Sequence, residues 1–213
     1  MNRFENKVVL ITGSGGGLGK ASALRFVEEG ARVVIADIDL ESAEAVADEI
    51  GSQAKAIKAD VTSIDDCKAM VQTAQDIYGQ LNVVFANAGV GGNKTEFVDM
   101  SIEEWDRVVD VNLRGMMLTC KASVPALIEA GGGALVLMGS STGGWDTILG
   151  SGPYMTSKEA VKAMGRNLAL ELGRYNIRVN VICPGIIQTQ LSFRQGDQDR
   201  DAWKHFFGKF SDR

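Results

Sequence analysis

Short apolar runs alternate with longer amphipathic stretches along the chain. Most of the runs are rich in Val and Ile, which favour buried β-strands. They predict strands at 7–12, 31–36, 54–59, 81–86, 133–138 and 177–182, of which 54–59 has the weakest pattern. The stretches between them predict helices at 17–29, 41–50, 64–78, 101–130 and 153–175. Ser101 and Glu104 form a capping-box pattern that marks the start of the fourth helix.

This strand–helix rhythm predicts an α/β fold, in which a single parallel sheet carries helices on both faces. Right-handed crossovers make such a sheet doubly wound, of the Rossmann type, with the strand order 3-2-1-4-5-6. The chain has 213 residues, three prolines and no Pro/Ser-rich linker, so we expect one domain over 1–213.

Composition argues against several classes of function. The net charge of −5 offers no basic surface for nucleic acid, and no apolar run approaches the roughly 20 residues that span a membrane. Cys67, Cys120 and Cys183 are far apart and form no CxxC pair, which argues against zinc and redox sites. The single histidine, His205, excludes a His-rich metal site and is expected on the surface or in a lid. Because no signal-peptide pattern is found and the three cysteines fit reduced thiols, we expect a cytoplasmic protein. The cysteine spacing and the single histidine lead us to expect no metal.

A glycine-rich turn follows the first predicted strand directly. It reads Thr12-Gly13-Ser14-Gly15-Gly16-Gly17-Leu18-Gly19 and leads into the first helix. Glycines let the chain turn tightly and bring backbone N–H groups against a pyrophosphate, and the helix N-terminus adds favourable dipole charge. Such a cluster can also be only a flexible turn, but its place between a strand and a helix favours dinucleotide binding.

Asp37 follows the second predicted strand, 18 residues after Gly19. An acidic residue at about this distance hydrogen-bonds the adenosine ribose 2′-hydroxyl of NAD, and its charge would repel a 2′-phosphate. Ser14, Gly15 and Ile38 supply no compensating cation. We therefore expect NAD rather than NADP as the cofactor. The alternative is that Asp37 only opens the turn over 37–39.

Separate motifs resemble those of the classical short-chain dehydrogenases/reductases. The glycine segment matches their TGxxxGxG pattern, 87–89 (NAG) their NAG signature, and 154–158 (YMTSK) their YxxSK motif. Ser141 lies 13 residues before Tyr154, as their catalytic serine does. Asn112 corresponds to their fourth active-site residue. The motifs follow the family's order over essentially the whole chain.

Further segments are similar to the family at its cofactor site. Pro184-Gly185 with Thr189 resembles the PG motif on the nicotinamide side. Ala86 stands where family members commonly have a second Asn before the NAG signature, and we expect this to alter one local hydrogen bond without changing the chemistry.

The resemblance implies the site residues. The catalytic set would be Asn112, Ser141, Tyr154 and Lys158. The cofactor set would be Gly13, Ser14, Gly15, Gly17, Leu18, Gly19, Asp37, Ile38, Asp60, Val61, Asn87, Ala88, Gly89, Tyr154, Lys158, Pro184, Gly185, Ile187 and Thr189. In the family's scheme, Lys158 also holds the nicotinamide ribose, Asn112 holds a water of a proton relay, and Asp60 lies near the adenine.

Tyr154 and Lys158 make chemical sense without the family. Residues four apart on a helix share a face, so the two side chains can meet. A free phenol has a pKa of about 10, too high for a base at neutral pH, and a nearby ammonium stabilises the phenolate. Tyr154 thereby becomes a candidate general acid/base, while Ser141 can hydrogen-bond the substrate oxygen.

Each feature alone has an ordinary structural explanation. A Tyr and a Lys at this spacing are common on helix surfaces, and 140–142 could be a polar turn. Asn112 could hydrogen-bond back to its own helix, and Asp60 could belong to a helix N-cap region. The joint occurrence of these residues at the carboxyl ends of strands and on facing helices favours a ligand crevice.

The sequence stops at Arg213, within what is expected to be a substrate lid from about residue 188 onward. Family members usually continue through another helix and a seventh parallel strand, so we expect that strand to be missing and strand six to form an edge. A shortened chain, a natural short form and a partial sequence all remain open. The family's tetramer uses the missing elements, but the helices over 101–130 and 153–175 could still form a dimer. We expect a homo-oligomer, either dimer or tetramer.

We expect an oxidoreductase that interconverts a secondary alcohol and its ketone. One alternative is a 3-oxoacyl thioester reductase, against which Asp37 counts because biosynthetic reduction usually uses NADPH. The other is a non-catalytic NAD-binding module, against which the intact Ser141, Tyr154 and Lys158 count.

In this fold the specificity wall comes from 91–97, 143–150 and the segment after 188. An apolar pocket is suggested by Trp145, Ile148, Leu149, Leu191 and Phe193.

Overall fold

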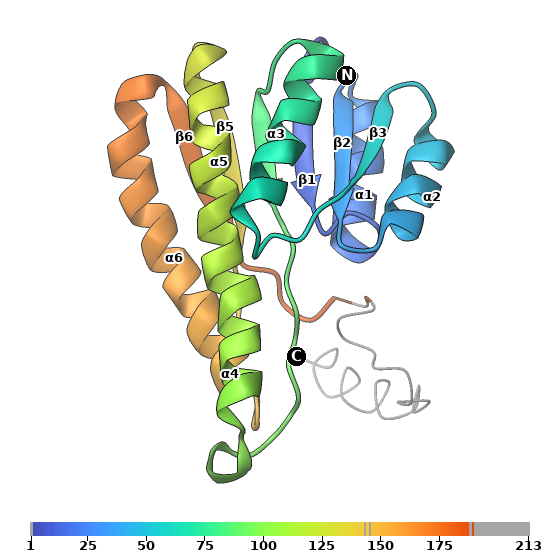
Figure 1. Ribbon diagram of the computed structural model, residues 1–213. Coiled ribbons are helices and arrows are strands. Elements are labelled where there is room, and N and C mark those ends of the chain that lie inside the picture. Colours follow the sequence, from blue (N-terminus) through green and yellow to red (C-terminus); the bar gives the residue numbers. More distant parts are fainter. Residues whose placement is uncertain (1, 143, 145, 188, 190–213) are drawn as a thin grey trace, which may run out of the picture.

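Six parallel strands form one sheet flanked by helices in the computed structural model (Figure 1). The structure describes residues 2–142, 144, 146–187 and 189. The strands are β1 (Val8–Thr12), β2 (Arg32–Asp37), β3 (Ala54–Lys58), β4 (Val83–Ala86), β5 (Gly133–Met138) and β6 (Ile177–Ile182). They pair in parallel in the order β3-β2-β1-β4-β5-β6, which confirms the predicted fold class and strand order.

Helices cover both faces of this sheet. They are α1 (Gly17–Glu28), α2 (Leu40–Ile50), α3 (Ile64–Tyr78), α4 (Ile102–Val109), α5 (Gly115–Glu129) and α6 (Gly152–Leu172). Shorter turns are η1 (Phe97–Asp99), η2 (Asp110–Arg114) and η3 (Gly173–Tyr175). In Figure 1, α3 and α5 lie in front of the sheet and α1 lies behind it. This division follows from right-handed crossovers, because the chain passes from β1 outward to β3 and then returns to β4.

The helix starts follow local capping chemistry. The side chain of Ser63 accepts a hydrogen bond from Asp66 N–H at the start of α3, at 3.2 Å. Ser101 does the same for Glu104 N–H at the start of α4, also at 3.2 Å, as the capping-box pattern predicts. Each cap satisfies one of the N–H groups that have no partner within the helix.

Three predicted elements differ from the structure by more than a one-residue shift of a boundary. The strand expected over 81–86 begins at Val83, because Asn82 turns its side chain to accept Val8 N–H at 2.9 Å. The single helix expected over 101–130 is interrupted by the π-helical turn η2. The helix expected over 153–175 ends at Leu172, and its last turn tightens into the 3₁₀ turn η3.

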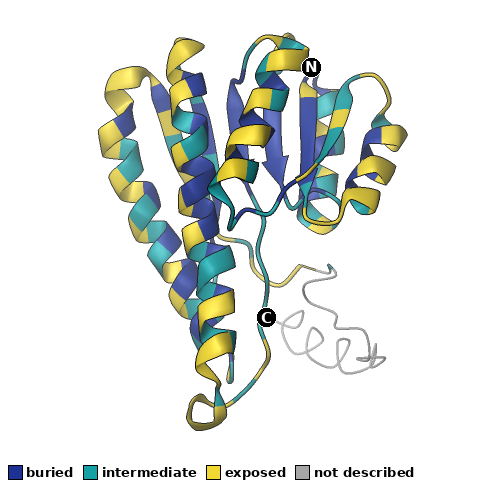
Figure 2. Cartoon of the chain, viewed as in Figure 1, coloured by how far each residue is buried: buried dark blue, intermediate teal, exposed yellow. Residues whose placement is uncertain are grey.

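The core lies around the central strands. Every residue of β1 and β4 is buried, which explains why these strands form continuous apolar runs in the sequence. Strand β3 lies at one edge and exposes Lys55 and Lys58, a common protection of sheet edges. At the opposite side, β6 alternates: Val179 and Val181 pack on the core, while Arg178 and Asn180 are exposed. Figure 2 shows buried residues in the central strands and exposed residues on the outward faces of the helices.

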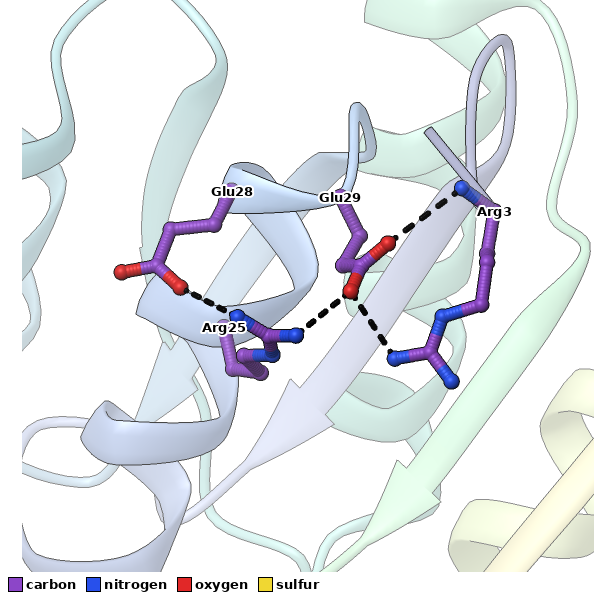
Figure 3. A network of polar contacts seen from close by, with 4 residues as sticks. All are labelled: Arg3, Arg25, Glu28 and Glu29. Carbon is purple, nitrogen blue, oxygen red and sulfur yellow. Dashed lines mark hydrogen bonds and ion pairs between the residues drawn. The ribbon is translucent and has the colours of Figure 1, made fainter. Parts of the chain in front are cut away.

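A charged network ties the N-terminal segment to the end of α1 (Figure 3). The Glu29 carboxylate accepts hydrogen bonds from the guanidinium groups of Arg3 at 2.9 Å and Arg25 at 2.6 Å. Arg25 also pairs with Glu28 at 2.9 Å. The hydrogen bond from Arg3 holds the pKa of Glu29 below its usual value. The sequence did not predict this network, because Arg3 and Glu29 lie 26 residues apart.

Several predictions fall on residues outside the described part. These are the lid beyond residue 189 with Leu191, Phe193 and His205, and the wall residue Trp145. Within the described residues, none of the helices has both the length and the apolar character needed to cross a membrane.

Candidate active site

The predicted site residues gather where the strands end. The glycine loop follows β1, Asp37 ends β2, and 87–89 follows β4. The segment 140–142 follows β5, and 184–185 follows β6. Because all strands are parallel, these segments share one edge of the sheet, which is where an open α/β fold binds ligands.

Close packing explains the glycines of the first loop. Gly13 has φ +62°, and a Cβ at this position would lie 2.8 Å from Ala88 Cα. A Cβ at Gly19 would lie 2.3 Å from the carbonyl oxygen of Gly13. Any side chain would therefore move backbone, so both positions require glycine for space, and Gly13 requires it for conformation as well.

Thr12 joins the glycine loop to the segment after β4. Its hydroxyl accepts the N–H groups of Asn87 at 3.0 Å and Ala88 at 3.1 Å. The Asn87 amide in turn donates to the carbonyl oxygens of Thr12 and Gly13, both at 2.9 Å. Thr12 was absent from the predicted site set, although it opens the glycine motif. Its role needs a partner 75 residues away, which no local pattern reveals.

Asp37 lies beside the glycine loop and also opens the turn over 37–39. One carboxylate oxygen accepts Gly15 N–H at 2.8 Å, which places the charge beside the glycine loop. The other accepts Asp39 N–H at 3.1 Å and so opens the turn, as the structural alternative expects. The neighbouring Ile38 side chain is 62% exposed, so it lies on the surface beside this loop.

Other predicted cofactor residues are engaged with the protein itself. Asp60 accepts two hydrogen bonds from Thr62, from its N–H at 2.9 Å and its hydroxyl at 2.8 Å, close to the N-cap of α3. The Val61 side chain is buried, and a Cβ at Gly115 would lie 2.7 Å from it. Leu18 packs against the core. The Val61 side chain is therefore closed to a ligand, whereas that of Leu18 is only partly buried.

Lys158 is a buried cation at the predicted catalytic end. It is 2% exposed, and its ammonium donates to the carbonyl oxygen of Met138 at 2.9 Å. The Nζ atom lies 5.7 Å from the centroid of the Tyr154 ring, within the range of cation–π attraction. Burial lowers the pKa of Lys158 to about 8, so the amine is still mainly protonated at neutral pH.

Gly89 shows that three predicted groups meet at one point. A Cβ there would lie 3.0 Å from Asn112 Oδ1 and 3.3 Å from Lys158 Nζ. The amine of Lys158 therefore reaches the segment after β4 from α6, on the far side of β5.

Asn112 connects this point to Tyr154. Its side-chain oxygen accepts Val90 N–H at 2.8 Å, and its amide donates to Val90 O at 2.9 Å. The amide also donates to Ser157 Oγ at 3.3 Å, and that hydroxyl donates to Tyr154 O at 2.7 Å. The residue lies in the π turn η2, a distortion often found at functional sites. Ser157 was not predicted as a site residue, although it is the serine of the YxxSK motif.

Ser141 joins the ends of β5 and β6. Its N–H donates to Pro184 O at 2.9 Å, and its carbonyl accepts Asp146 N–H at 3.2 Å. The expected polar turn is thus present, and it lies where β5 and β6 end. Farther along, a Cβ at Gly17 would lie 3.5 Å from Thr189 Cβ, so the segment after β6 reaches the glycine loop. Between them, Gly185 and Ile187 are exposed.

The assembled site has two chemically different ends. The end at Gly13–Gly19 and Asp37 offers backbone donors and a carboxylate, which suit a pyrophosphate and a ribose. The end at Ser141, Tyr154 and Lys158 offers hydroxyl groups and a cation, which suit proton transfer. In the described ranges, no group of three His, Cys, Asp or Glu side chains is placed to hold a metal ion.

Comparison with known proteins gives consistent relatives. The family model described as short chain dehydrogenase matches residues 7–200. The chain is 42% identical over 195 residues to the cyclohexanol dehydrogenase of Acinetobacter sp. (strain SE19), covering 89% of this chain and 76% of that protein. It is 38% identical over 197 residues to the 2,5-dichloro-2,5-cyclohexadiene-1,4-diol dehydrogenase of Sphingobium indicum, covering 90% and 77%.

Solved structures agree with these relatives. The crystal structure of a 3-ketoacyl-(acyl-carrier-protein) reductase from Brucella melitensis complexed with NADH has a TM-score of 0.86 and 35% identity, covering 89% of this chain and 79% of that one. The crystal structure of levodione reductase has a TM-score of 0.88 and 34% identity, covering 96% and 83%.

Proposed function

Since the chain belongs to the short-chain dehydrogenase family of oxidoreductases, we propose that it transfers a hydride between NAD and a secondary alcohol or its ketone. The observation that carries the proposal is the place of Lys158. Its ammonium is buried beside Gly89 and Asn112 and lies 5.7 Å from the Tyr154 ring. A lysine exposed on a helix surface would make none of these contacts.

The glycine loop and Asp37 fit NAD. A loop in which a Cβ would collide with backbone can approach a pyrophosphate closely through its N–H groups. The Asp37 carboxylate, held beside Gly15, suits a ribose 2′-hydroxyl and disfavours a 2′-phosphate. When bound, NAD would supply the hydride acceptor. Pro184-Gly185 would flank its nicotinamide end, while Thr189 lies beside Gly17 of the glycine loop.

Tyr154 would move the proton. In alcohol oxidation it takes the hydroxyl proton while the carbinol hydrogen leaves as hydride, and in ketone reduction both transfers run backward. Lys158 would stabilise the phenolate by its charge, and Ser141 would hydrogen-bond the substrate oxygen. The Asn112 side chain is engaged by Val90 and Ser157, so a relay water at this residue would bind its backbone carbonyl.

The relatives narrow the substrate class. One is a cyclohexanol dehydrogenase and another a cyclohexadiene-diol dehydrogenase, so a carbocyclic secondary alcohol is the first substrate to test. A 3-oxoacyl thioester reductase is the second candidate, because a structural relative with that activity in its name is complexed with NADH. An acidic residue at position 37 therefore does not separate the two candidates.

Absorbance at 340 nm tests the proposal directly. Purified protein should form NADH from NAD and cyclohexanol, and should oxidise NADH more slowly with a 3-oxoacyl thioester. The opposite order would favour the reductase. Binding of NAD without turnover of any alcohol or ketone would instead indicate a non-catalytic NAD-binding module.

Asp37→Ala tests the cofactor assignment. Loss of the carboxylate should raise the affinity for NADPH relative to NADH by at least about tenfold, because like-charge repulsion and a ribose hydrogen bond are both removed. Asp39→Ala is a matched control, since the Asp39 carboxylate caps α2 by accepting hydrogen bonds from Ser42, outside the glycine loop. An unchanged NADH/NADPH ratio in Asp37→Ala would refute the role given to Asp37.

The proposal includes assembly and location. Apolar side chains are exposed on two long helices, Met117 and Ile128 on α5 and Leu170 on α6, which supports a homodimer through these helices. Sedimentation of the protein with Leu170→Glu would test this interface.

The free thiols of Cys67 and Cys120 are buried, and they are compatible with the reducing cytoplasm in which we expect the enzyme to work.

A further inference from the structure

The segment over 90–95 is irregular, yet the protein holds it at three points. Asn112 binds both backbone groups of Val90, at 2.8 and 2.9 Å. The carboxylate of Glu104 accepts Asn93 N–H at 2.5 Å. The N–H of Thr95 donates to Gly150 O at 3.1 Å. A segment without helix or strand is thus fixed by bonds from three other parts of the chain.

Glu104 is well placed to hold this segment. It lies in the first turn of α4 and is only 13% exposed at its side chain. Arg107 donates to both of its oxygens, from Nε at 2.9 Å and from Nη2 at 3.0 Å. This pairing raises the pKa of Arg107 and orients the carboxylate toward the segment. The Asn93 N–H therefore meets a fixed, charged acceptor.

Gly92 confirms how closely the segment lies against α4. Its φ is +71°, and a Cβ there would lie 2.9 Å from Val108 Cγ2 and 3.3 Å from Glu104 Oε1. The segment therefore rests on the same helix that carries its carboxylate anchor.

We propose that Glu104 is a positioning residue that fixes 90–95 as one wall of the substrate site. The wall is continuous with the catalytic end, because Asn112 binds Val90 and also reaches Tyr154 through Ser157. It is also joined to the segment near 150 through the Thr95–Gly150 bond. That this wall borders a substrate site rests on the function proposed above. The anchoring of 90–95 by Glu104 does not depend on that function.

Glu104 should affect binding of large substrates more than chemistry. Without the carboxylate, the wall loses its central bond, while Asn112 and Gly150 still hold its two ends. A substrate that fills the site would then meet a loosely defined surface and bind less tightly. Once bound, it would face the same Tyr154, Ser141 and Lys158.

Glu104→Ala tests this, with Glu103→Ala as a matched control on the same exposed helix turn. We expect hydrogen exchange of 91–95 to become about tenfold faster in Glu104→Ala, since a bond to a charged acceptor is lost. The KM for cyclohexanol should rise about fivefold to tenfold, while that for 2-propanol changes less than twofold. The kcat and the Kd for NAD should stay within twofold. Glu104→Gln keeps an acceptor for Asn93 N–H and should recover most of the loss.

The outcomes separate this proposal from a general structural role and from the proposed function. Unchanged exchange of 91–95 would overturn it, and so would equal losses in NAD binding and in KM for both alcohols. Arg107→Ala provides a second variant if Glu104→Ala folds poorly, and it should show the same pattern more weakly. If the wild type oxidises no alcohol, the proposed function fails, and hydrogen exchange alone decides the anchoring.

Discussion

The two halves of the site are built by different means. On the cofactor side, between β1 and β3, the decisive contacts involve backbone: glycines that touch Ala88 and Gly13, and N–H groups that meet Asp37. On the catalytic side, between β4 and β6, the side chains of Asn112 and Ser157 hydrogen-bond to each other. They also bond to the backbone of Val90 and Tyr154. Steric exclusion of side chains therefore shapes the cofactor side, and hydrogen bonds made by side chains shape the catalytic side.

This difference predicts which kind of substitution disrupts each half of the site. A backbone cradle fails when any atom is added, because the displaced neighbour is main chain. A side-chain network fails when an atom is removed, because a buried partner then lacks its hydrogen bond. Substitutions that add or remove single groups should therefore affect NAD binding and turnover separately.

Removing the Tyr154 hydroxyl should give the largest effect. Tyr154→Phe keeps the ring beside Lys158 but deletes the proton carrier, so kcat should fall by about 10²–10⁴-fold. The Kd for NAD should change less than threefold. Steady-state kinetics with cyclohexanol and NAD titrations would measure both, and full activity in this variant would show that the acid/base assignment is wrong.

A methyl group added to the glycine loop should instead weaken NAD binding and change kcat far less. In Gly19→Ala the new Cβ would meet Gly13 O at 2.3 Å and Ser14 Cα at 2.8 Å, so the loop must shift. We expect NAD affinity to fall about tenfold to a hundredfold, corresponding to overpacking of roughly 1–3 kcal/mol, while kcat at saturating NAD changes far less.

Gly173→Ala is the control for this substitution. Gly173 has an ordinary φ of −54° and open space around its Cβ position, so alanine should leave NAD binding unchanged. Equal affinities for NAD in Gly19→Ala and the wild type would contradict the account of a steric cradle.

The same contrast explains how far the sequence could predict the site. The glycine loop, Asp37 and the strand order were predicted because their causes are local: strand, turn and helix follow one another in the chain. Thr12, Ser157 and the wall anchor Glu104 were not, because each acts through a distant partner. Glu104 was recognised only for its capping pattern with Ser101, which gives no sign that its carboxylate binds Asn93.

Ser157→Ala should weaken the catalytic side moderately. The change deletes the acceptor of Asn112 and the donor to Tyr154 O, both in a buried region. We expect a loss of about 1–2 kcal/mol in the free energy of unfolding and a severalfold lower kcat, with NAD affinity unchanged. The exposed neighbour Thr156 supplies the control Thr156→Ala, and equal kcat in the two variants would argue against a positioning role for Ser157.

Glu29 should show the smallest functional effect, because its network lies at the N-terminal end of β1, away from the site (Figure 3). Its pKa is lowered by Arg3, so the folded state gains stability at pH values above the ordinary glutamate pKa. That gain is lost as the pH falls through the lowered value. Glu29→Gln should therefore reduce Tm at pH 7 and approach the wild type as the pH falls through that lowered pKa, with kcat and NAD affinity unchanged at neutral pH.

The comparison with Glu28→Gln decides whether burial matters in this network. Both glutamates pair with Arg25, but the Glu29 side chain is 4% exposed and the Glu28 side chain 63%. An exposed pair contributes little, since water and salt screen it, so Glu28→Gln should leave Tm nearly unchanged at every pH. If both variants lost stability equally, the number of charges would matter rather than the desolvated bond to Arg3. If Glu29→Gln also weakened NAD binding, the cofactor side would depend on distant side chains, and its contrast with the catalytic side would fail.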